Sequence, residues 1–484
     1  RYEVLPRDRV KNDDDRFALN YRHQQNWGEG WSGNVVVQKV SDSTYFTDLT
    51  TQIATTSQTV LPRSGTINKT GLWGTDGTWQ ASAGVQHWQT LQANPSNPVT
   101  APYNRSQLTF NVSKPNLAYT DFDLSSSAID FTNSGQVSGQ RYVAYPSFSL
   151  PLQNSYAYVT PKVGMHVTRY EFDPATTGLN NQYRTLPILS TATGLVLERS
   201  TSMFGQGMQQ TLEPRLYYVY IPTRLQNQLP VYDTAQQDVN FATLFTENQF
   251  SGSDRINDAN QMTAGLTSRL LQDNGIERLR AGVAQRFYYK SQEVTLPNVA
   301  PRGSNASDLL AAVSGTVMPH WTVDSGAQYA TDQAHFQRFN TGVRYQPQPG
   351  SVVNAAYRYT NSQATTTGTP IRQLDFSTQW PLTNKLSAVG RYNYSIPDNK
   401  SLEILAGFEY DGGCWAFRVV AHQITTSAAT QVTSIFMQLE LNGLSKIGSN
   451  PLDLLRRRIG GYARPDANVT DANYGYDTGN PPRY

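Results

Sequence analysis

Side chains that could carry out catalysis or bind a metal are few in this sequence, and their spacing suits neither task. The six histidines are His23, His87, His166, His320, His335 and His422. No two of them are four residues apart, as on a metal-binding helix, and none belongs to a cysteine or carboxylate motif. A glycine-rich phosphate loop and a G-x-S-x-G nucleophile turn are also absent. We therefore predict no catalytic residue, no metal site, no cofactor and no enzymatic activity.

One enzymatic alternative remains open. A hydrolase can be built from side chains on the wall of a β-barrel without leaving a contiguous motif. His422, with residues of neighbouring strands, is the kind of group that such an enzyme would use. A histidine on a water-filled wall is more commonly an ordinary polar residue, so we favour the interpretation without catalysis.

The elements that would position these residues must be inferred from composition and pattern. Only 16% of the residues are charged, 38% are hydrophobic and 11% are aromatic, with 28 tyrosines. This is an unusual composition for a soluble enzyme. The formal net charge of +2 gives no indication of nucleic-acid binding. No window approaches the roughly 18 apolar residues of a transmembrane helix, and no signal peptide begins the chain, so we expect a cleaved signal or a fragment.

The dominant pattern is an alternation of apolar and polar residues, which indicates β-strands. It is clearest in the last third of the chain. Between residues 402 and 410, Glu403 and Glu409 lie on one face. The opposite face carries Leu402, Ile404, Ala406, Phe408 and Tyr410. Similar runs occur at 385–395, 415–422 and 434–442. The fold class that this pattern predicts is all-β and antiparallel.

A soluble sandwich also alternates, so strand length and strand ends must decide between a sandwich and a barrel. The runs have about ten or more residues, which suits a tilted membrane strand better than a soluble strand of about 5 to 6 residues. Aromatic residues gather near their ends, as in the girdles of membrane barrels. Charged residues on the other face require water. We predict a large antiparallel transmembrane β-barrel with about 22 strands.

Three parts of the chain are distinguished by pattern. Residues 1–446 are predicted to form the barrel, and within them the long loop 223–260 lacks alternation. This loop is either a mobile surface loop or a segment that folds over the barrel mouth or onto a plug, and the sequence does not separate the two. Residues 447–462 are predicted to be a short C-terminal helix or turn, of which we favour a solvated turn. Residues 463–484 are predicted to be a disordered tail.

Several stretches, in this order and spacing over roughly residues 35 to 460, resemble one family. They are Lys39-Val40-Ser41-Asp42, Gln210-Thr211-Leu212-Glu213-Pro214-Arg215, Asp254-Arg255-Ile256, Gly265-Leu266-Thr267-Ser268-Arg269, Gly407-Phe408-Glu409-Tyr410, Cys414-Trp415, Gln438-Leu439-Glu440-Leu441 and Leu454-Leu455-Arg456. Each is weak alone, but the set is specific. The family is that of the lipopolysaccharide-assembly outer-membrane protein LptD.

The resemblance implies a 26-stranded barrel in the bacterial outer membrane, preceded by a periplasmic jelly-roll domain. It also implies an LptE-like lipoprotein plug inside the barrel and a periplasmic bridge that delivers lipopolysaccharide through the N-terminal domain. The lipopolysaccharide then reaches the outer leaflet through a lateral gate between the first and last strands. With about 22 predicted strands, we expect the N-terminal domain and the first strands to be absent from this chain.

The resemblance assigns roles to several residues. The last gate strand is placed near 432–441, with Ile435, Met437, Leu439 and Leu441 as its candidate residues. Candidates for contact between the long loop and the plug are Asp254, Arg255, Asn257 and Asp258. The alternation, and not the resemblance, gives the candidates for facing a polar lumen or contacting the plug: Arg391, Glu403, Glu409, Arg418 and Glu440. For any one of them, an ordinary residue of a wet wall is the favoured alternative.

Two departures accompany the resemblance. The family usually has two adjacent cysteines where this chain has Gly413 and Cys414. Cys414 is therefore a disulfide candidate whose partner lies outside the chain, with a free or buried thiol as the alternative. A general porin or gated solute transporter would share the composition but not the set of motifs, and it is the alternative function.

Overall fold

The computed structural model describes residues 1–49, 58–92, 99–172, 178–203, 205–365, 368–425, 431–441 and 444–464. Most of them belong to one 25-stranded sheet, and each strand pair whose register is given is antiparallel. The prediction of an all-β antiparallel fold is confirmed. Among the described residues, no helix is long and apolar enough to cross a membrane.

The chain divides into two compact units, which are described separately. Unit 1 comprises residues 1–197, 212–266 and 284–307. It contains β1 (Tyr2–Asp8), β2 (Asp14–Gly28), β3 (Trp31–Val40), α1 (Tyr45–Leu49), β4 (Val60–Trp73), β5 (Gly77–Thr90), β6 (Asn104–Leu117), β7 (Thr120–Thr132), β8 (Gly139–Ser149), β9 (Leu152–Gln153), β10 (Ala157–Glu171), β11 (Gln182–Leu195) and α4 (Phe241–Leu244). Four strands contribute residues to both units: β12 (Leu197–Met203), β13 (Gln206–Ile221), β14 (Ala259–Gln272) and β15 (Glu277–Tyr288).

Unit 2 comprises residues 198–211, 267–283 and 308–484. Its own elements are β16 (Leu309–Met318), β17 (Trp321–Ala330), β18 (His335–Gln348), β19 (Ser351–Thr360), η1 (Ser362–Ala364), β20 (Ile371–Pro381), β21 (Leu386–Ser395), β22 (Lys400–Asp411), β23 (Trp415–Thr425), β24 (Gln431–Leu441), β25 (Ser445–Gly448) and α5 (Leu452–Arg458). From β16 to β25, each strand pairs with the next along the chain, as in a meander.

Tight turns explain how neighbouring strands keep their register. Glu29 and Gly30 join β2 to β3 with φ angles of 49° and 81°. Two consecutive positive φ values suit the right-handed twist of a hairpin. A Cβ atom on Gly30 would lie 2.2 Å from the carbonyl oxygen of Thr70 on β4, so this position requires glycine for space as well as for conformation.

The predicted count of about 22 strands was too low. The strands that alternation could not reveal include β9 with two residues and β25 with four. Alternation is recognised over about four to eight residues, so β9 is too short to show it, and the four residues of β25 do not alternate. They form because a neighbouring strand offers its backbone groups, which is a tertiary effect.

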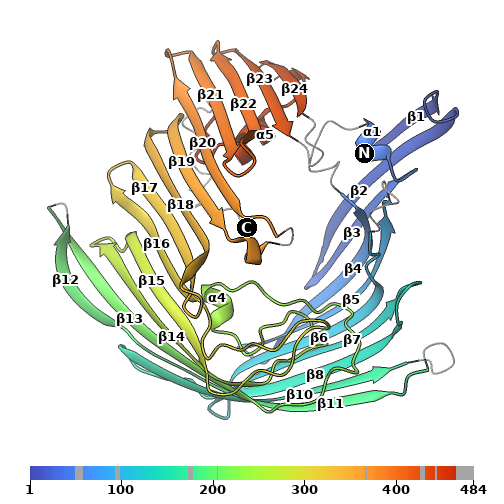
Figure 1. Ribbon diagram of the computed structural model, residues 1–484, viewed down its shortest axis with the longest axis vertical. Helices are drawn as coiled ribbons and strands as arrows, with labels where there is room; N and C mark the ends of the chain where they lie inside the picture. Colours follow the sequence, from blue (N-terminus) through green and yellow to red (C-terminus); the bar gives the residue numbers. More distant parts are fainter. Residues whose placement is uncertain are drawn as a thin grey trace. The chain divides into compact units, whose positions relative to one another are not determined.

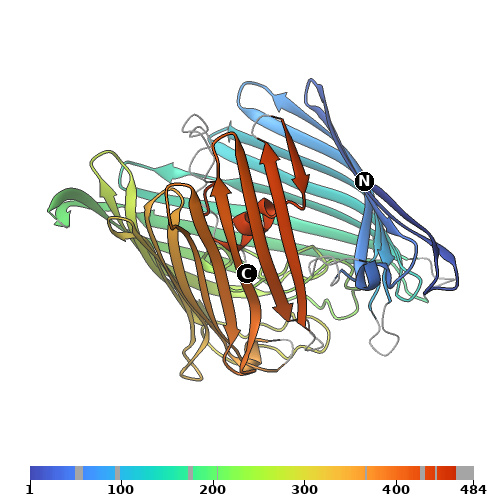
Figure 2. The ribbon, with the colours of Figure 1, turned by 90° about the horizontal axis from the view of Figure 1, so that it is seen from above.

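The structure near the C-terminus also differs from the solvated turn that was favoured for residues 447–462. Residues 452–458 form helix α5 and not a solvated turn, and Leu452, Leu455 and Ile459 are buried. Their spacing of three and four residues places them on one side of a helix. Figure 2 shows α5 against one face of the strands β20–β24. The tail beyond residue 464, predicted to be disordered, lies outside the described residues.

Candidate functional site

The strands of unit 1 separate apolar from polar side chains by face. On β10, the side chains of Val163, Met165 and Val167 are 51%, 42% and 40% exposed, whereas His166 and Thr168, on the opposite face, are 6% and 0% exposed. A soluble sheet has the reverse arrangement, with its apolar face covered. We call the two sides the apolar face and the polar face.

The polar face of unit 1 is covered in part by residues 223–258, which we call the docked loop. Figure 1 shows α4 and the chain around it on one side of β6–β11. Ile256, in this loop, packs against Leu186 and Ile188 of β11 and Val219 of β13. A mobile surface loop would leave these side chains in water. Residues 223–258 therefore pack onto the sheet of this chain, and a position over the barrel mouth or on a plug remains a prediction.

Asp254 is the central anchor of the docked loop and is completely buried. Its carboxylate accepts hydrogen bonds from Arg141 at 2.6 Å and from the Tyr170 hydroxyl at 3.1 Å. It also accepts from the backbone amides of Tyr232 at 2.8 Å and Asp233 at 3.1 Å. Four donors around one carboxylate offset the cost of removing the charge from water.

The surroundings of Asp254 explain its ionisation. Burial alone would raise the pKa of the carboxyl group, but the Arg141 guanidinium and the two backbone amides outweigh this effect and hold the pKa below its ordinary value. Asp254 therefore stays charged at neutral pH. Arg141 also forms a two-point ion pair with Asp233, at 2.7 and 2.8 Å, and stacks on the ring of Phe131.

A second arginine of the wall, Arg184 on β11, binds the backbone of the docked loop. It donates to the carbonyl oxygens of Ser253 at 2.5 Å and Asp254 at 2.9 Å, and to the side chain of Gln226 at 2.7 Å. Gln226 in turn donates to the carbonyl of Ile256 at 2.8 Å. These contacts fix the course of the loop backbone as well as one side chain.

The four predicted plug-contact residues are all engaged within this chain. Asp254, Arg255, Asn257 and Asp258 are between 0% and 3% exposed. Arg255 donates to the carbonyl of Leu229 at 2.8 Å. Asp258 accepts from the backbone amides of residues 293 and 294 at 3.0 and 3.1 Å. Their side chains are inaccessible to a second protein in this structure, so a plug contact through them remains a prediction without structural support.

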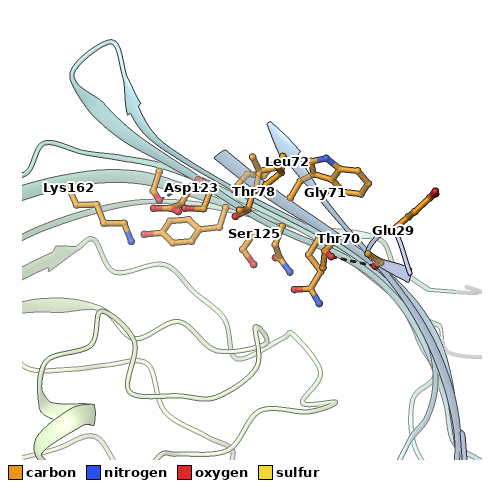
Figure 3. A pocket seen from close by; sticks show the side chains of 17 residues that line it. Glu29, Thr70, Gly71, Leu72, Thr78, Asp123, Ser125 and Lys162 are labelled. Carbon is orange, nitrogen blue, oxygen red and sulfur yellow. Dashed lines mark hydrogen bonds between the residues drawn. The ribbon is translucent and has the colours of Figure 1, made fainter. Parts of the chain in front are cut away.

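The polar face of unit 1 also has a hollow of about 910 Å³ over strands β4–β10. Figure 3 shows Lys162 and Ser125 projecting from the strands toward the side of the docked loop. At its edge, Glu247 of the loop receives a hydrogen bond from Tyr145 at 2.6 Å and an ion pair from Lys162 at 3.2 Å. Further polar residues that line it are Thr70, Thr78, Gln80, Asn111, Ser113, Asp123 and Ser147. Hydroxyl, amide and charged groups of this kind can bind the hydroxyls of a saccharide.

The family-like motif at residues 39–42 has a structural role in the same unit. Arg16 on β2, 2% exposed, is held by Asp42 through two hydrogen bonds of 2.9 Å and by Asp8 through one of 3.0 Å. Burial tends to raise the pKa of the Asp42 carboxyl group, but hydrogen bonds from Arg16, Ser41 and Thr44 prevail and lower the pKa to about 2. Asp42 is thus a charged partner for Arg16 at the end of β3.

In unit 2, three of the predicted lumen-facing residues form one buried cluster. Glu409 on β22 lies directly opposite Arg418 on β23 in the strand register. The Nε atom of Arg418 is 3.2 Å from Glu409, and its Nη1 atom is 2.7 Å from Glu440 on β24. Arg418 is 1% exposed. One guanidinium thus bridges carboxylates of the two flanking strands.

The other two predicted lumen-facing residues, Arg391 on β21 and Glu403 on β22, also meet. The Glu403 carboxylate is 3.3 Å from the Arg391 guanidinium and 2.7 Å from His422 Nε2. His422 Nε2 is bound by Glu403, and among the described residues no hydrogen bond joins His422 to a serine hydroxyl. The hydrolase alternative therefore gains no support. Arg391 also contacts Asp375 at 2.5 Å.

All five of these residues lie on the face opposite to the exposed apolar side chains of unit 2. Phe408, Ile435 and Met437 on that apolar face are 50%, 64% and 53% exposed. The register of β22, β23 and β24 explains this separation, because residues directly opposite one another share a face. That the polar face lines a water-filled lumen remains a prediction.

Sequence reasoning missed what covers this polar face, namely residues 449–464, which we call the C-terminal segment. Tyr462 donates to Glu409 at 2.5 Å, and Ala463 exchanges two hydrogen bonds of 2.7 and 3.0 Å with the side chain of Gln379 on β20. The apolar contacts of Leu455 and Ile459 are with Val352, Val389, Leu405 and Val420. The helical spacing of the leucines was a visible signal, but its partner surface was not.

The residues predicted for the last gate strand lie on β24, but β24 is not the last strand described. β25 pairs with its end, from Gln438 to Leu441. The Ser449 hydroxyl then accepts a hydrogen bond from the backbone amide of Met437 at 2.9 Å. The backbone amide of Ser449 donates to the Met437 carbonyl, also at 2.9 Å. The chain leaves the edge of β24 at this point. Leu439 and Leu441 are half-buried, whereas Ile435 and Met437 are exposed.

Cys414, in the turn between β22 and β23, is exposed and free. A disulfide with a cysteine outside this chain remains a prediction. In the part of the chain that the structure describes, no group of three histidine, cysteine or carboxylate side chains could hold a metal ion.

Fold and site together define a class, that of large antiparallel β-sheet proteins with an apolar exposed face and a polar face covered by their own loops. The family model described as LptD, LPS transport system D, matches residues 14–386. LPS-assembly proteins LptD from Azoarcus sp. (strain BH72) and Nitrosomonas eutropha are 41% and 40% identical to this chain, each over 96% of it. The chain belongs to the LptD family.

The chain spans 57% and 63% of the length of these two relatives. Among solved structures, it is similar to the siderophore receptor PirA from Acinetobacter baumannii, with a TM-score of 0.37 and 9% identity, over 84% of this chain and 77% of that one. The ferric enterobactin receptor PfeA from Pseudomonas aeruginosa gives a TM-score of 0.35 with 9% identity, over 78% of this chain and 70% of that one. Similarity at this level does not bear on function.

Proposed function

We propose that this chain is the membrane-spanning part of a translocon that inserts lipopolysaccharide into the outer leaflet of the bacterial outer membrane. The observation that carries the proposal is the separation of faces, seen independently in both units. Apolar side chains such as Val163 and Ile435 are exposed, whereas Arg184 and Arg418 are buried on the other side. A contiguous apolar face suits lipid, and a polar face suits a hydrated interior.

The cargo requires both kinds of surface. Each methylene of an acyl chain exposed to water costs about 0.8 kcal/mol, so several chains cannot cross a wet lumen. The saccharide cannot cross hydrocarbon. A polar route for the saccharide, joined to a lateral gate for the acyl chains, keeps each part in a favourable solvent. The hollow around Ser125 and Lys162 lies on such a polar surface.

The gate would lie at the edge of the sheet formed by β24. The register of β25 covers only Gln438 to Leu441, and the contacts of Ser449 with Met437 end this ladder. Backbone groups of β24 before Met437 need a further strand in lipid, because unpaired groups are costly there. A strand from the remainder of the parent protein would supply that pairing and could separate to open the gate.

The partners proposed with this function are an LptE-like lipoprotein plug, a periplasmic bridge that delivers lipopolysaccharide, and lipopolysaccharide itself. They belong to the full-length parent, since the chain spans only part of its relatives. The names of the relatives describe assembly and no chemical reaction, which agrees with a protein that is not an enzyme.

Depletion of the full-length parent in its own bacterium tests the proposal. Newly made lipopolysaccharide would be measured at the cell surface with a probe that cannot cross the outer membrane, and uptake of a small hydrophilic solute would be measured in the same cells. We expect surface lipopolysaccharide to fall, and a plasmid copy of the parent to restore it. Unchanged surface lipopolysaccharide with reduced solute uptake would replace the proposal by a general porin or gated solute transporter.

A further inference from the structure

Helix α5 carries two arginines that form no ion pair among the described residues of unit 2. Arg456 and Arg457 are both exposed. Within the described part of unit 2, no carboxylate lies within 4.0 Å of either guanidinium. Arg457 makes one contact along the helix, a hydrogen bond of 3.0 Å from Nε to the backbone carbonyl of Asp453. The side chains are free to bind an anion.

The other cations of the same stretch are already paired with the wall. Arg458 lies 3.1 Å from Glu403, and Arg464 and Lys446 lie 3.3 and 3.0 Å from Glu440. Glu409 is occupied by Arg418 and Tyr462. The buried carboxylates of the wall are therefore committed. Helix α5 itself has Asp453 against Arg456, Arg457 and Arg458, so its charge is positive in excess.

Packing sets the direction of these two side chains. Leu455 and Ile459 are completely buried against the polar face of β19–β23. Successive residues of a helix are separated by about 100° around its axis. Arg457 therefore projects about 200° from Leu455, away from the wall, and Arg456 projects about 100° from it, to the side of the helix. Both side chains are exposed to solvent, where an anion can reach them.

We propose that Arg456 and Arg457 form an anion-binding site for the phosphate groups of the transported lipopolysaccharide. This inference rests on the proposed function. The planar guanidinium matches phosphate through two parallel hydrogen bonds, so each of the two arginines can bind a phosphate group. The site is exposed to water, so its contacts are weak and reversible. A conduit requires that property, because cargo held tightly would not be released.

Site-specific photocrosslinking in the full-length parent, in cells with its natural partners, tests the site. A photoreactive amino acid would replace Asp453, which is exposed on the same helix. Crosslinked lipopolysaccharide would be compared between the parent sequence, a variant with Arg456→Gln and Arg457→Gln, and a control with Arg456→Lys and Arg457→Lys. We expect the glutamine variant to lose about five- to tenfold, as for two exposed charge contacts, and the lysine control to keep most of the signal.

A second comparison identifies the group that is bound. In the purified complex, lipopolysaccharide would be compared with the same material after chemical removal of its phosphates. The dephosphorylated form should crosslink weakly to the parent sequence. The glutamine substitutions should not reduce this weak signal further. Inorganic phosphate, added as a competitor at millimolar concentration, should lower the signal only with phosphorylated material. Equal crosslinking of both forms would overturn the assignment.

Failure of this site and failure of the proposed function can be distinguished. A photoreactive residue in place of Ser125, in the hollow of unit 1, serves as a reference position. If Ser125 captures lipopolysaccharide and the glutamine variant still crosslinks normally at 453, only the arginine site is wrong. Capture of a protein at 453 would instead assign the arginines to an acidic partner. If neither position captures lipopolysaccharide, the proposed function itself fails.

Discussion

The docked loop of unit 1 and the C-terminal segment of unit 2 both cover a polar face, but they do so with opposite charges. In unit 1 the wall supplies the cations, Arg141 and Arg184, and the loop supplies the buried carboxylate of Asp254. In unit 2 the wall supplies the carboxylates, and the segment brings Arg458 and Arg464. Each covering segment is thus matched to its own wall.

The two regions also differ in how their contacts are distributed. Asp254 receives four hydrogen bonds, so the docked loop depends strongly on one side chain. The C-terminal segment combines separate polar contacts with an apolar contact made by Leu455 and Ile459. We therefore expect single substitutions to affect the loop more than the segment.

The largest effect is expected for Asp254→Ala. It leaves Arg141 buried with a weaker set of partners, and loss of one partner of a buried ion pair costs about 3 to 5 kcal/mol. The loop should become sensitive to protease, and the unfolding temperature should fall. Asp238→Ala, an exposed carboxylate of the same loop, is the matched control. Equal protease resistance of both variants would contradict the role of Asp254.

A smaller effect is expected for Glu409→Ala in unit 2. Arg418 would lose one carboxylate but keep Glu440 at 2.7 Å, so we expect a loss of stability of about 2 to 3 kcal/mol, seen in thermal unfolding. Glu409→Gln keeps an acceptor for the Tyr462 hydroxyl and should cost less. If Glu409→Ala destabilises more than Asp254→Ala, the comparison between the two regions is wrong.

Acidification should release the docked loop through Asp254. Its pKa is lowered in the folded protein, so the stabilising contribution is complete above the unfolded value of about 3.9 and is lost as the pH falls through the lower folded value. Protease resistance of the loop should therefore be constant near neutrality and decline below about pH 4. In Asp254→Asn the decline should be much weaker. If protease resistance declined equally in the variant, other carboxylates would be responsible for the effect of acid.

The smallest effect is expected for Tyr462→Phe. It removes one hydrogen bond to the charged Glu409, which is typically worth about 1.5 to 3 kcal/mol at a buried site and less here, where Tyr462 is partly exposed. Hydrogen exchange should accelerate in residues 459–464 and remain unchanged in the docked loop. If hydrogen exchange accelerated in both regions, the stability of the docked loop would depend on the contacts of the C-terminal segment.

Sequence alternation predicted the strands and their faces because it is a local property. Glu403 and Glu409 alternate with Phe408 within a single strand, so their separation onto two faces follows from the backbone alone. The same reasoning could not find β25, whose four residues do not alternate between apolar and polar. Nor could it decide between a helix and a turn at residues 452–458, because so short a helix depends on packing.

The sites were less predictable because their partners are far apart in sequence. Arg141 and Asp254 are 113 residues apart, and Gln379 and Ala463 are 84 residues apart. Neither pair leaves a local pattern. The available signal was weaker: Arg141 and Arg184 are isolated cations within alternating strands, on the face that needs water or a partner.

The measurement that tests the account most directly is photocrosslinking from the two faces of one strand group in living cells. Photoreactive residues would replace Ser125, on the polar face, and Leu108, which is 61% exposed on the apolar face. The account predicts that lipopolysaccharide in transit is captured at Ser125, and that this capture stops when its supply is blocked, whereas Leu108 captures membrane lipid regardless of supply. Capture of lipopolysaccharide at Leu108 alone would contradict a polar route for the saccharide.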